Sequence, residues 1–379
     1  MNVARFKKRL RKHKFAWWAR NMLKCVIPQE RVLDTIDDSS ELNVADVVTI
    51  EWPVGMERPS IGIVLDRSSP PYWTKYKRFA MNNGLPFGII DIHTSNWIDK
   101  AQKYDMIVWR PLSSPSSMEE ARRKIYILEK HLGMLCYPSY DTLVLYEDKV
   151  MQFEQFRLHE IPAISTFITH SKNEAIEFVN HAEYPLVSKI TTGSGSAGVE
   201  IVRNKAKARR IIDEVFSERG RWTYWPYLRQ HAYVYFQQFI KNARYDLRVI
   251  AIGNRVFGYY RYPPKGDFRA SGIGEVTKGE LPEEAMYLAM TVAQRLNLIM
   301  AAVDMVYDPD NQMYQVIEVS TFIRVDTPEQ LVVDGTPGMY IQRDGQFEFK
   351  PGTYWIQELT LKDLLKDCWI RPRLGNGRG

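Results

Sequence analysis

Short apolar runs separated by turn residues fill the middle of the chain. They are rich in β-branched and aromatic side chains, and they span residues 184–187, 199–202, 233–240, 246–252 and 256–262. Such runs, punctuated by glycine, proline or asparagine, predict a meandering β-sheet. Residues 282–296 interrupt the pattern, because their apolar side chains recur at the spacing of one helix face. Two further strands are predicted at 299–307 and 313–319.

The segment before this sheet has the pattern of an α/β unit. Continuous apolar runs at 61–66, 88–91 and 106–110 indicate buried parallel strands, and residues 73–83 and 118–132 have helical composition. At 379 residues with 45% hydrophobic side chains, the chain can hold two or three domains with packed cores. We therefore expect a mixed α/β (α+β) fold. Its predicted parts are a basic aromatic N-terminal arm, a small α/β domain, a larger strand-rich domain and a C-terminal extension, at residues 1–30, 50–140, 141–325 and 326–379.

The extension carries weaker signals. Residues 334–338 and Gly352 indicate turns. Residues 355–369 predict a short helix, with four leucines toward the core: Leu359, Leu361, Leu364 and Leu365.

A glycine- and serine-rich loop stands between two of the predicted strands. It follows Lys189 and contains Gly193, Ser194, Gly195, Ser196 and Gly198. With so few side chains, its backbone N–H groups can approach a polyphosphate closely, and the lysine adds a positive charge. A strand-like segment follows where a dinucleotide-binding fold needs a helix, and the Gly-Lys-Ser/Thr ending of a Walker A loop is lacking. A nucleotide held by a hairpin loop is the first ligand to expect, and a flexible hairpin tip is the alternative.

Two carboxylates lie inside the last two apolar runs. Asp304 stands in Ala-Ala-Val-Asp-Met-Val, and Glu318 stands in Gln-Val-Ile-Glu-Val. A charge among apolar neighbours is unfavourable unless it is paired or bound to a cation. One hairpin would bring both carboxylates together, where they would repel each other unless Mg²⁺ lay between them. Either residue alone is better interpreted as an outward-facing strand residue, but for both, after a phosphate loop, we expect a metal.

The order of these features resembles the ATP-grasp superfamily, and most closely its ribosomal-protein-modifying, glutathione-synthetase-like branch. The resemblance runs from about Asp148 to Ser320, roughly half the chain. It implies ATP and Mg²⁺ as cofactors, and an ATP-grasp fold preceded by a small pre-ATP-grasp domain. The implied nucleotide contacts are Lys149, Lys189, the loop from Gly193 to Gly198, the adenine hinge Gln237, Gln238, Phe239 and Ile240, and the ribose position Asp246. The implied metal ligands are Asp304, Glu318 and Ser320, and the implied catalytic residues are Lys189 and Arg269.

Two positions depart from the family pattern. The last metal strand usually ends Glu-x-Asn, whereas this chain has Ser320, which implies weaker binding of a second metal ion. The hinge commonly begins with glutamate, whereas this chain has Gln238, a change of little weight because the hinge acts largely through backbone groups. The residues after Arg269 also differ, which implies that recognition of the acceptor has diverged.

The chemistry implied by the resemblance is carboxylate activation. A carboxylate takes the γ-phosphoryl group of ATP to form an acyl phosphate and ADP, and an amine then displaces phosphate. Arg269 would hold the developing charge with its planar guanidinium, and a solvated loop charge is the alternative for this residue. We expect an ATP-dependent carboxylate-amine ligase that attaches an amino acid to a uronic-acid-containing surface polysaccharide or lipid-linked precursor. The alternatives are a peptide- or protein-modifying ligase and a nucleotide-binding scaffold without catalysis.

The N-terminal arm bears on where the protein is located in the cell. Residues 1–24 contain nine Lys or Arg and no acidic residue, so the remaining chain has 42 basic against 45 acidic residues. Tryptophans and phenylalanines are interleaved with these charges, which suits an anionic membrane surface. A nucleic-acid or acidic-partner arm and a solubilising or docking helix are the alternatives, although nucleic acid is not the expected partner of the whole protein. Three widely spaced cysteines indicate a reducing cytoplasm. We expect a cytoplasmic protein, peripheral on the membrane if the arm binds lipid, with a homo-oligomer as an open option.

Overall fold

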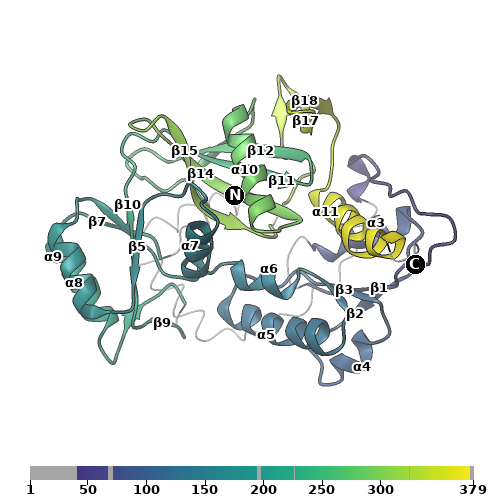
Figure 1. The fold of residues 1–379 in the computed structure, drawn as a ribbon, viewed down its shortest axis with the longest axis horizontal. Helices are drawn as coiled ribbons and strands as arrows, with labels where there is room; N and C mark the ends of the chain where they lie inside the picture. Colours follow the sequence, from purple (N-terminus) through teal and green to yellow (C-terminus); the bar gives the residue numbers. More distant parts are fainter. Residues whose placement is uncertain (1–40, 67–70, 194–197, 226, 324, 376–379) are drawn as a thin grey trace, which may run out of the picture.

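A computed structural model describes residues 41–66, 71–193, 198–225, 227–323 and 325–375 (Figure 1). The predicted basic arm lies outside these residues, and so do Ser194, Gly195 and Ser196 of the predicted phosphate loop. Within the described ranges, no helix has the length and apolar character needed to cross a bilayer.

The first unit is a four-stranded parallel sheet with the order β2-β1-β3-β4. Its strands are β1 (Ile61–Val64), β2 (Phe87–Ile90), β3 (Met106–Val108) and β4 (Leu135–Tyr137). Its helices are α3 (Trp73–Asn82), α4 (Trp97–Ala101) and α5 (Pro115–Tyr126), with a 3-10 turn at Glu41–Val44 before the sheet and a π-helical turn at Ile127–His131 after α5. All residues of β1 and β3 are buried, which explains their uninterrupted apolar runs. The three predicted parallel strands are confirmed, and β4 is a fourth.

The second unit is a small antiparallel sheet with the order β5-β10-β6-β7. Its strands are β5 (Thr166–Thr169), β6 (Leu186–Ser188), β7 (Glu200–Val202) and β10 (Val234–Gln238). Helices α8 (Lys172–His181) and α9 (Lys205–Val215) cover one face and share a separate apolar core with the sheet (Figure 1). A two-stranded hairpin, β8 (Arg221–Trp222) and β9 (Arg229–Gln230), lies beside them. Helices α6 (Tyr140–Leu145) and α7 (Lys149–Leu158) connect this unit to the first.

The third unit is an eight-stranded sheet, built on the order β15-β14-β11-β12-β17-β16. The strands are β11 (Asp246–Ile252), β12 (Arg255–Tyr262), β13 (Glu275–Thr277), β14 (Met300–Asp308), β15 (Met313–Ser320), β16 (Val332–Val333), β17 (Thr336–Arg343) and β18 (Gln346–Pro351). Helix α10 (Glu283–Arg295) packs on β11 and β14 through alanine, methionine and valine side chains. The predicted helix and the strands around it are confirmed, so the mixed α/β fold is confirmed as well.

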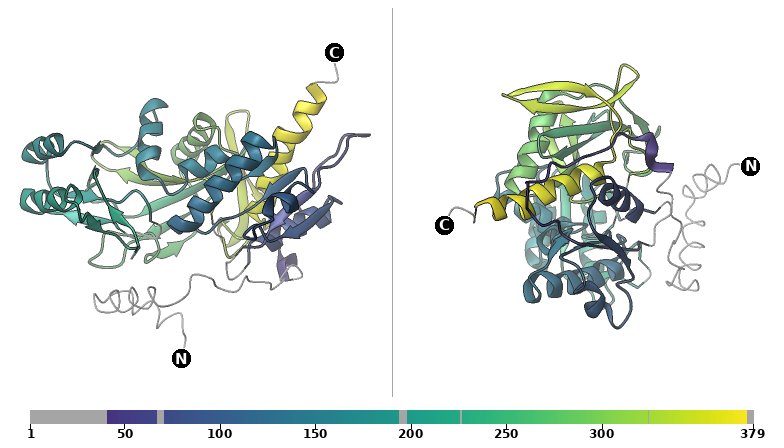
Figure 2. Two further views of the ribbon diagram at one scale, coloured as in Figure 1. Left: turned by 90° about the horizontal axis from the view of Figure 1, so that it is seen from below. Right: turned by 90° about the vertical axis from the view of Figure 1, so that its right-hand side faces the viewer.

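The C-terminal residues connect the third unit to the first. Helix α11 (Ile356–Leu364) continues through a π-helical segment, Leu365–Ile370, into α12 (Arg371–Gly375), and all four predicted leucines are buried. Helix α11 packs against α3, and a buried ion pair joins Arg78 to Glu358 with an N to O distance of 2.6 Å. Figure 2 shows this helical segment beside the α/β unit, away from α8 and α9.

Candidate functional site

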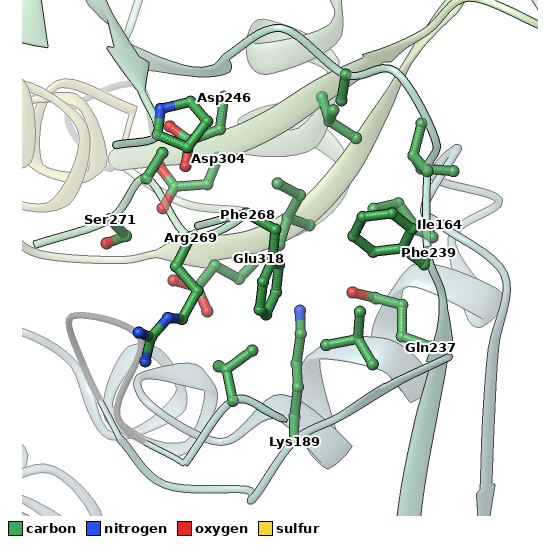
Figure 3. Close-up of a pocket in the computed structure, with 18 of the residues that line it drawn as sticks. Ile164, Lys189, Gln237, Phe239, Asp246, Phe268, Arg269, Ser271, Asp304 and Glu318 are labelled. Carbon is green, nitrogen blue, oxygen red and sulfur yellow. The ribbon is translucent and has the colours of Figure 1, made fainter. Parts of the chain in front are cut away.

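A cavity lies between the small sheet and the eight-stranded sheet (Figure 3). The cavity has a volume of about 160 Å³. Most of the residues predicted for a nucleotide site line it: Lys149, Lys189, Gly193, Gln237, Gln238, Phe239, Ile240, Asp246, Arg269, Asp304 and Glu318. The fold therefore brings together residues that are up to 169 positions apart in the chain, from Lys149 to Glu318.

Two buried lysines enter the cavity from different elements. Lys189 follows β6, and Figure 3 shows its side chain pointing toward Glu318. Lys149 begins α7, where Asp148 caps the helix by accepting the amide hydrogen of Met151 at 3.0 Å. The Lys149 ammonium donates to the carbonyl of Gly193 at 3.0 Å and lies 3.3 Å from a carboxylate oxygen of Glu318.

The two lysines differ in the ease with which they lose a proton. Burial lowers the pKa of Lys189 to about 8, Glu318 opposes this shift, and Lys149 adds to it. Burial also acts against the charge of Lys149, but Glu318 and Glu147 outweigh it and raise the pKa of Lys149. Lys149 thus keeps its positive charge, whereas Lys189 can lose its proton at about pH 8.

The glycine loop joins β6 to β7 as an antiparallel hairpin, as predicted. Gly198 ends the loop with φ of +77°, and a Cβ there would collide with the side chain of Ile190. Gly198 itself does not line the cavity, but Gly193 and Val199 on either side of the loop do.

An apolar pocket occupies the end of the cavity next to the predicted hinge. Phe239 and Ile240 follow β10, and they are joined on the cavity wall by Ile164, Val187, Val306 and Ile317. The backbone N–H of Gln238 already donates to the carbonyl of Ser165 at 2.8 Å, and the Gln237 side chain donates to Thr166 at 2.9 Å. Within the predicted hinge, Phe239 and Ile240 are therefore the residues whose backbone is best suited to meet a planar base.

Asp304 and Glu318 face each other across adjacent strands. They are direct partners in the register of β14 and β15, so their side chains share one face of the sheet. Ser320 lies two residues beyond Glu318, opposite Ala302, and therefore on the same face. The predicted pairing of these two carboxylates by one hairpin is confirmed.

The environment of Asp304 corrects one step of the sequence argument. We expected that only a cation could reconcile two neighbouring carboxylates, but Arg248 donates to both oxygens of Asp304 at 2.6 and 2.7 Å, and Arg261 approaches it at 2.9 Å. Burial raises the pKa of Asp304, but the two arginines outweigh it, so this pKa lies below its usual value. Protein side chains thus already compensate the Asp304 charge.

The donor set still fits a magnesium ion. Among the residues that the structure describes, no group of three or more His, Cys, Asp or Glu side chains could hold a metal alone. Mg²⁺ in phosphate-transfer sites usually takes one or two carboxylates and completes its shell with water and phosphate oxygens. Asp304 and Glu318 supply that number, beside the two lysines.

Asp246 is held by an arginine and does not point freely into the cavity. Its carboxylate accepts from Arg261, and burial raises its pKa to about 6 although Arg261 opposes the shift. The position still lines the cavity and can accept a hydroxyl hydrogen bond.

Arg269 lies on the long loop between β12 and β13. Asp267 accepts from its guanidinium at 3.0 and 2.7 Å, and this pairing raises the pKa of Arg269. The side chain is 39% exposed and lines the cavity (Figure 3). Asp267 therefore orients Arg269 without removing it from the solvent-facing side of the site.

Several cavity or site residues were not predicted from the sequence. They are Glu147, Ile164, Tyr245, Arg261 and Ser271. Arg261 could have been predicted, because an arginine inside an apolar strand suggests an ion pair when a neighbouring strand contains a buried aspartate. The other residues reach the site through the geometry of loops, which the residue pattern does not predict.

Comparison with known proteins decides the family of this region. Residues 146–332 match the family model of the RimK-like ATP-grasp domain. The chain carries a RimK-like ATP-grasp domain. This RimK-like domain includes every predicted site residue that lines the cavity.

Three curated relatives that match part of this chain are ligases by name. The glutamate–LysW ligase ArgX of Sulfolobus acidocaldarius is 27% identical over 172 residues, 45% of this chain and 56% of that protein. The alpha-aminoadipate–LysW ligase LysX of Sulfurisphaera tokodaii is 27% identical over 194 residues, 49% of this chain and 65% of that protein. A probable alpha-L-glutamate ligase of an Enterobacter species is 26% identical over 177 residues, 44% of this chain and 54% of that protein. The chain thus spans between about half and two thirds of the length of these relatives.

Solved structures share the fold. A RimK domain ATP-grasp protein of Sphaerobacter thermophilus superposes with a TM-score of 0.50 and 18% identity, over 70% of this chain and 92% of that chain. The ADP complex of N5-carboxyaminoimidazole ribonucleotide synthetase (purK) superposes with a TM-score of 0.50 and 14% identity, over 85% of this chain and 98% of that chain. This likeness shows an ATP-grasp fold.

Proposed function

We propose that this chain is an ATP-dependent carboxylate-amine ligase that forms ADP through an acyl-phosphate intermediate. The observation that carries the proposal is the cavity in which two buried lysines, a glycine hairpin and two facing carboxylates meet beside an apolar pocket. The names of the curated relatives support it, because they describe ligases of glutamate or alpha-aminoadipate.

ATP would lie with its base in the apolar pocket and its phosphates over the lysines. Phe239 and Ile240 would meet the adenine, and Asp246 the ribose. Lys149, Lys189 and the loop from Gly193 to Gly198 would hold the phosphates, since backbone amides and ammonium groups complement their charge. Asp304 and Glu318, with Ser320 next to them, would hold Mg²⁺, which supplies charge neutralisation on the phosphates when it is bound.

The reaction would proceed in two displacements. A carboxylate oxygen of the substrate attacks the γ-phosphorus, and the bond to the β,γ-bridging oxygen breaks, which yields ADP and an acyl phosphate. The amine nitrogen then attacks the acyl carbon, the carbon–oxygen bond to phosphate breaks, and the amine proton leaves to solvent. Arg269, oriented by Asp267, would stabilise the charge on the acyl phosphate and the tetrahedral intermediate.

The substrates are an amino acid and a larger acceptor. One candidate acceptor is a uronic-acid-containing surface polysaccharide or its lipid-linked precursor, motivated by the basic arm at residues 1–24 and its suitability for an anionic membrane surface. In that case the protein works in the cytoplasm, peripheral on the membrane. The second candidate is a polypeptide, favoured by the relatives whose names join an amino acid to LysW. A nucleotide-binding scaffold without turnover is less well supported, because both lysines, both carboxylates and Arg269 are present in one cavity.

The test is substrate-dependent release of ADP and phosphate by the purified chain with Mg-ATP. Amino acids are screened in pairs with uronic-acid sugars and with peptides, and a Glu318→Gln variant runs beside the wild type. We expect release that needs both a carboxylate and an amine and is lost in the variant. Nucleotide binding without release for any pair would favour the scaffold.

A further inference from the structure

Glu147 has an unusual backbone conformation at the edge of the nucleotide cavity. It stands two residues before α7 with φ of +55°, in the left-handed region that residues other than glycine, asparagine and aspartate rarely adopt. Such a conformation persists only where the surrounding structure enforces it, and it is frequent at functional sites. The contacts of Glu147 are therefore informative.

The Glu147 side chain contacts the first residue of the glycine loop. Its carboxylate accepts the amide hydrogen of Gly193 at 3.3 Å, while the Lys149 ammonium donates to the Gly193 carbonyl at 3.0 Å. Both polar backbone groups of Gly193 are thus held by two side chains that are two positions apart. Gly193 itself has φ of +151°, which L side chains rarely adopt.

Further bonds attach the same stretch to the stem of the loop. The Lys149 amide donates to the carbonyl of Thr191 at 3.1 Å, and the Thr191 hydroxyl donates to Asp148 at 2.8 Å. Consecutive residues from Glu147 to Lys149 therefore hold Thr191 and Gly193. This arrangement fixes the direction in which the loop leaves β6.

Charge adds to the arrangement. Burial acts against the charge of Lys149, but Glu318 and Glu147 raise its pKa; burial also raises the pKa of Glu147, and Lys149 opposes that shift. A glutamine in place of Glu147 would keep a hydrogen-bond acceptor for Gly193 but lose the carboxylate charge.

We propose that Glu147 is a positioning residue, which holds Gly193 in place beside the phosphates of bound ATP. The inference rests on the proposed function, since it assumes that the cavity binds ATP. Because Gly193 would meet the phosphates and the apolar pocket would take the base, loss of Glu147 should weaken binding of the β- and γ-phosphates and leave binding of the nucleoside part unchanged.

The test compares binding of ATP and AMP, each with Mg²⁺, by calorimetry on the full chain. Glu147→Ala and Glu147→Gly remove the carboxylate, and the glycine variant tolerates the left-handed backbone. We expect each to weaken ATP binding about tenfold, as for one lost hydrogen bond to a charged group, with AMP binding changed less than twofold. Glu147→Gln should recover most of the ATP affinity.

The matched control is Glu160, which stands at the other end of α7. It also has a left-handed φ, of +50°, but it is exposed and does not line the cavity. Glu160→Ala and Glu160→Gly should leave both affinities unchanged. Amide hydrogen exchange gives a second readout, and peptides that contain Gly193 should exchange faster in Glu147→Ala than in Glu160→Ala.

Two results would overturn the inference while leaving the proposed function intact. One is a Glu147→Ala variant that binds ATP as the wild type does. The other is equal weakening of ATP and AMP, which would indicate general damage to the cavity. A wild-type chain that binds neither nucleotide would instead contradict the proposed function, and the inference with it.

Discussion

Asp304 should matter for stability as well as for the proposed metal binding. Its side chain is 3% exposed and accepts charged hydrogen bonds from Arg248 at 2.6 and 2.7 Å, with Arg261 at 2.9 Å. Asp304→Asn removes the charge and places an amide against two guanidinium groups. Arg261 keeps Asp246 as a partner, so Arg248 is the guanidinium that loses its carboxylate partner. Breaking a buried ion pair by changing one partner costs about 3–5 kcal/mol, and we expect that decrease in the free energy of unfolding.

Glu318→Gln provides the comparison on the neighbouring strand. Its side chain is 26% exposed, and within the described part of the chain it forms an ion pair with Lys149 at 3.3 Å. Loss of one partly exposed pair should decrease the free energy of unfolding by about 1 kcal/mol or less. Both variants remove a proposed metal ligand. A difference between their free energies of unfolding therefore reports the structural role of Asp304 and not metal binding.

The assay is urea unfolding followed by tryptophan fluorescence, without nucleotide or metal. Because the folded pKa of Asp304 lies below its usual value, its contribution is present above the unfolded pKa and is lost only as pH falls through the lower, folded pKa. The midpoints of the wild type and of Asp304→Asn should therefore differ at about pH 8, which lies above the pKa of Asp304 and above the pKa of about 6 of the neighbouring Asp246. Equal midpoints for wild type and Asp304→Asn would refute the reasoning. If the expectation holds, Glu318→Gln is the better inactive control for activity measurements.

Three further predictions concern single ionisable residues. Burial lowers the pKa of Lys189 to about 8, so ATP affinity should fall as pH rises from about 7 to about 9, and Lys189→Arg should abolish the fall in a titration of the dissociation constant. Arg269→Lys keeps the charge but loses the planar fork, so kcat should drop on the order of a hundredfold while ATP binding, measured by calorimetry, stays the same; an equal loss of ATP affinity would contradict a role confined to the reacting groups. Burial raises the pKa of Glu358 to about 7 although Arg78 opposes this, so the protonated form is favoured on folding and stability should decrease as pH rises from about 4.5 through about 7. Glu358→Gln should flatten that slope in urea unfolding, and an unchanged slope would assign the pH dependence to another group.

The local pattern of the chain was sufficient to predict most elements of the nucleotide region. The run 246–252 coincides with β11, and the helix predicted at 282–296 is α10, Glu283–Arg295. Each of these elements buries one face, so its apolar residues recur with the period of a strand or of a helix. This period is visible in the sequence. The hairpin that joins β6 to β7 was predictable for the same reason, since strand-like residues flank the glycines.

The C-terminal strands were missed because their residues carry a mixed signal. Residues 334–338 indicate a turn, yet Thr336 begins β17, which pairs with β12 and β18. Strand β18 is mostly exposed, so no apolar run marks it. Its pairing depends on a partner strand distant in sequence, which the local pattern does not contain.

The ion pairs that compensate the charge of Asp304 could not be predicted from the local sequence either. Arg248 and Asp304 are 56 positions apart, and Arg261 comes from a third strand. Only the register of β11 between β12 and β14 places these side chains on one face. The sequence therefore predicted that Asp304 and Glu318 meet, but not that two arginines would compensate the charge of Asp304.

Transfer of oxygen from the substrate carboxylate to phosphate tests the central claim most directly. An amino acid or acceptor carboxylate labelled with ¹⁸O is incubated with the chain, Mg-ATP and the amine, and the released phosphate is analysed by mass spectrometry. Activation through an acyl phosphate predicts one ¹⁸O atom in each phosphate, because the carboxylate oxygen that attacks phosphorus leaves with it. Release of ADP with unlabelled phosphate would mean that water attacks ATP, and it would contradict the proposal that this cavity activates a carboxylate.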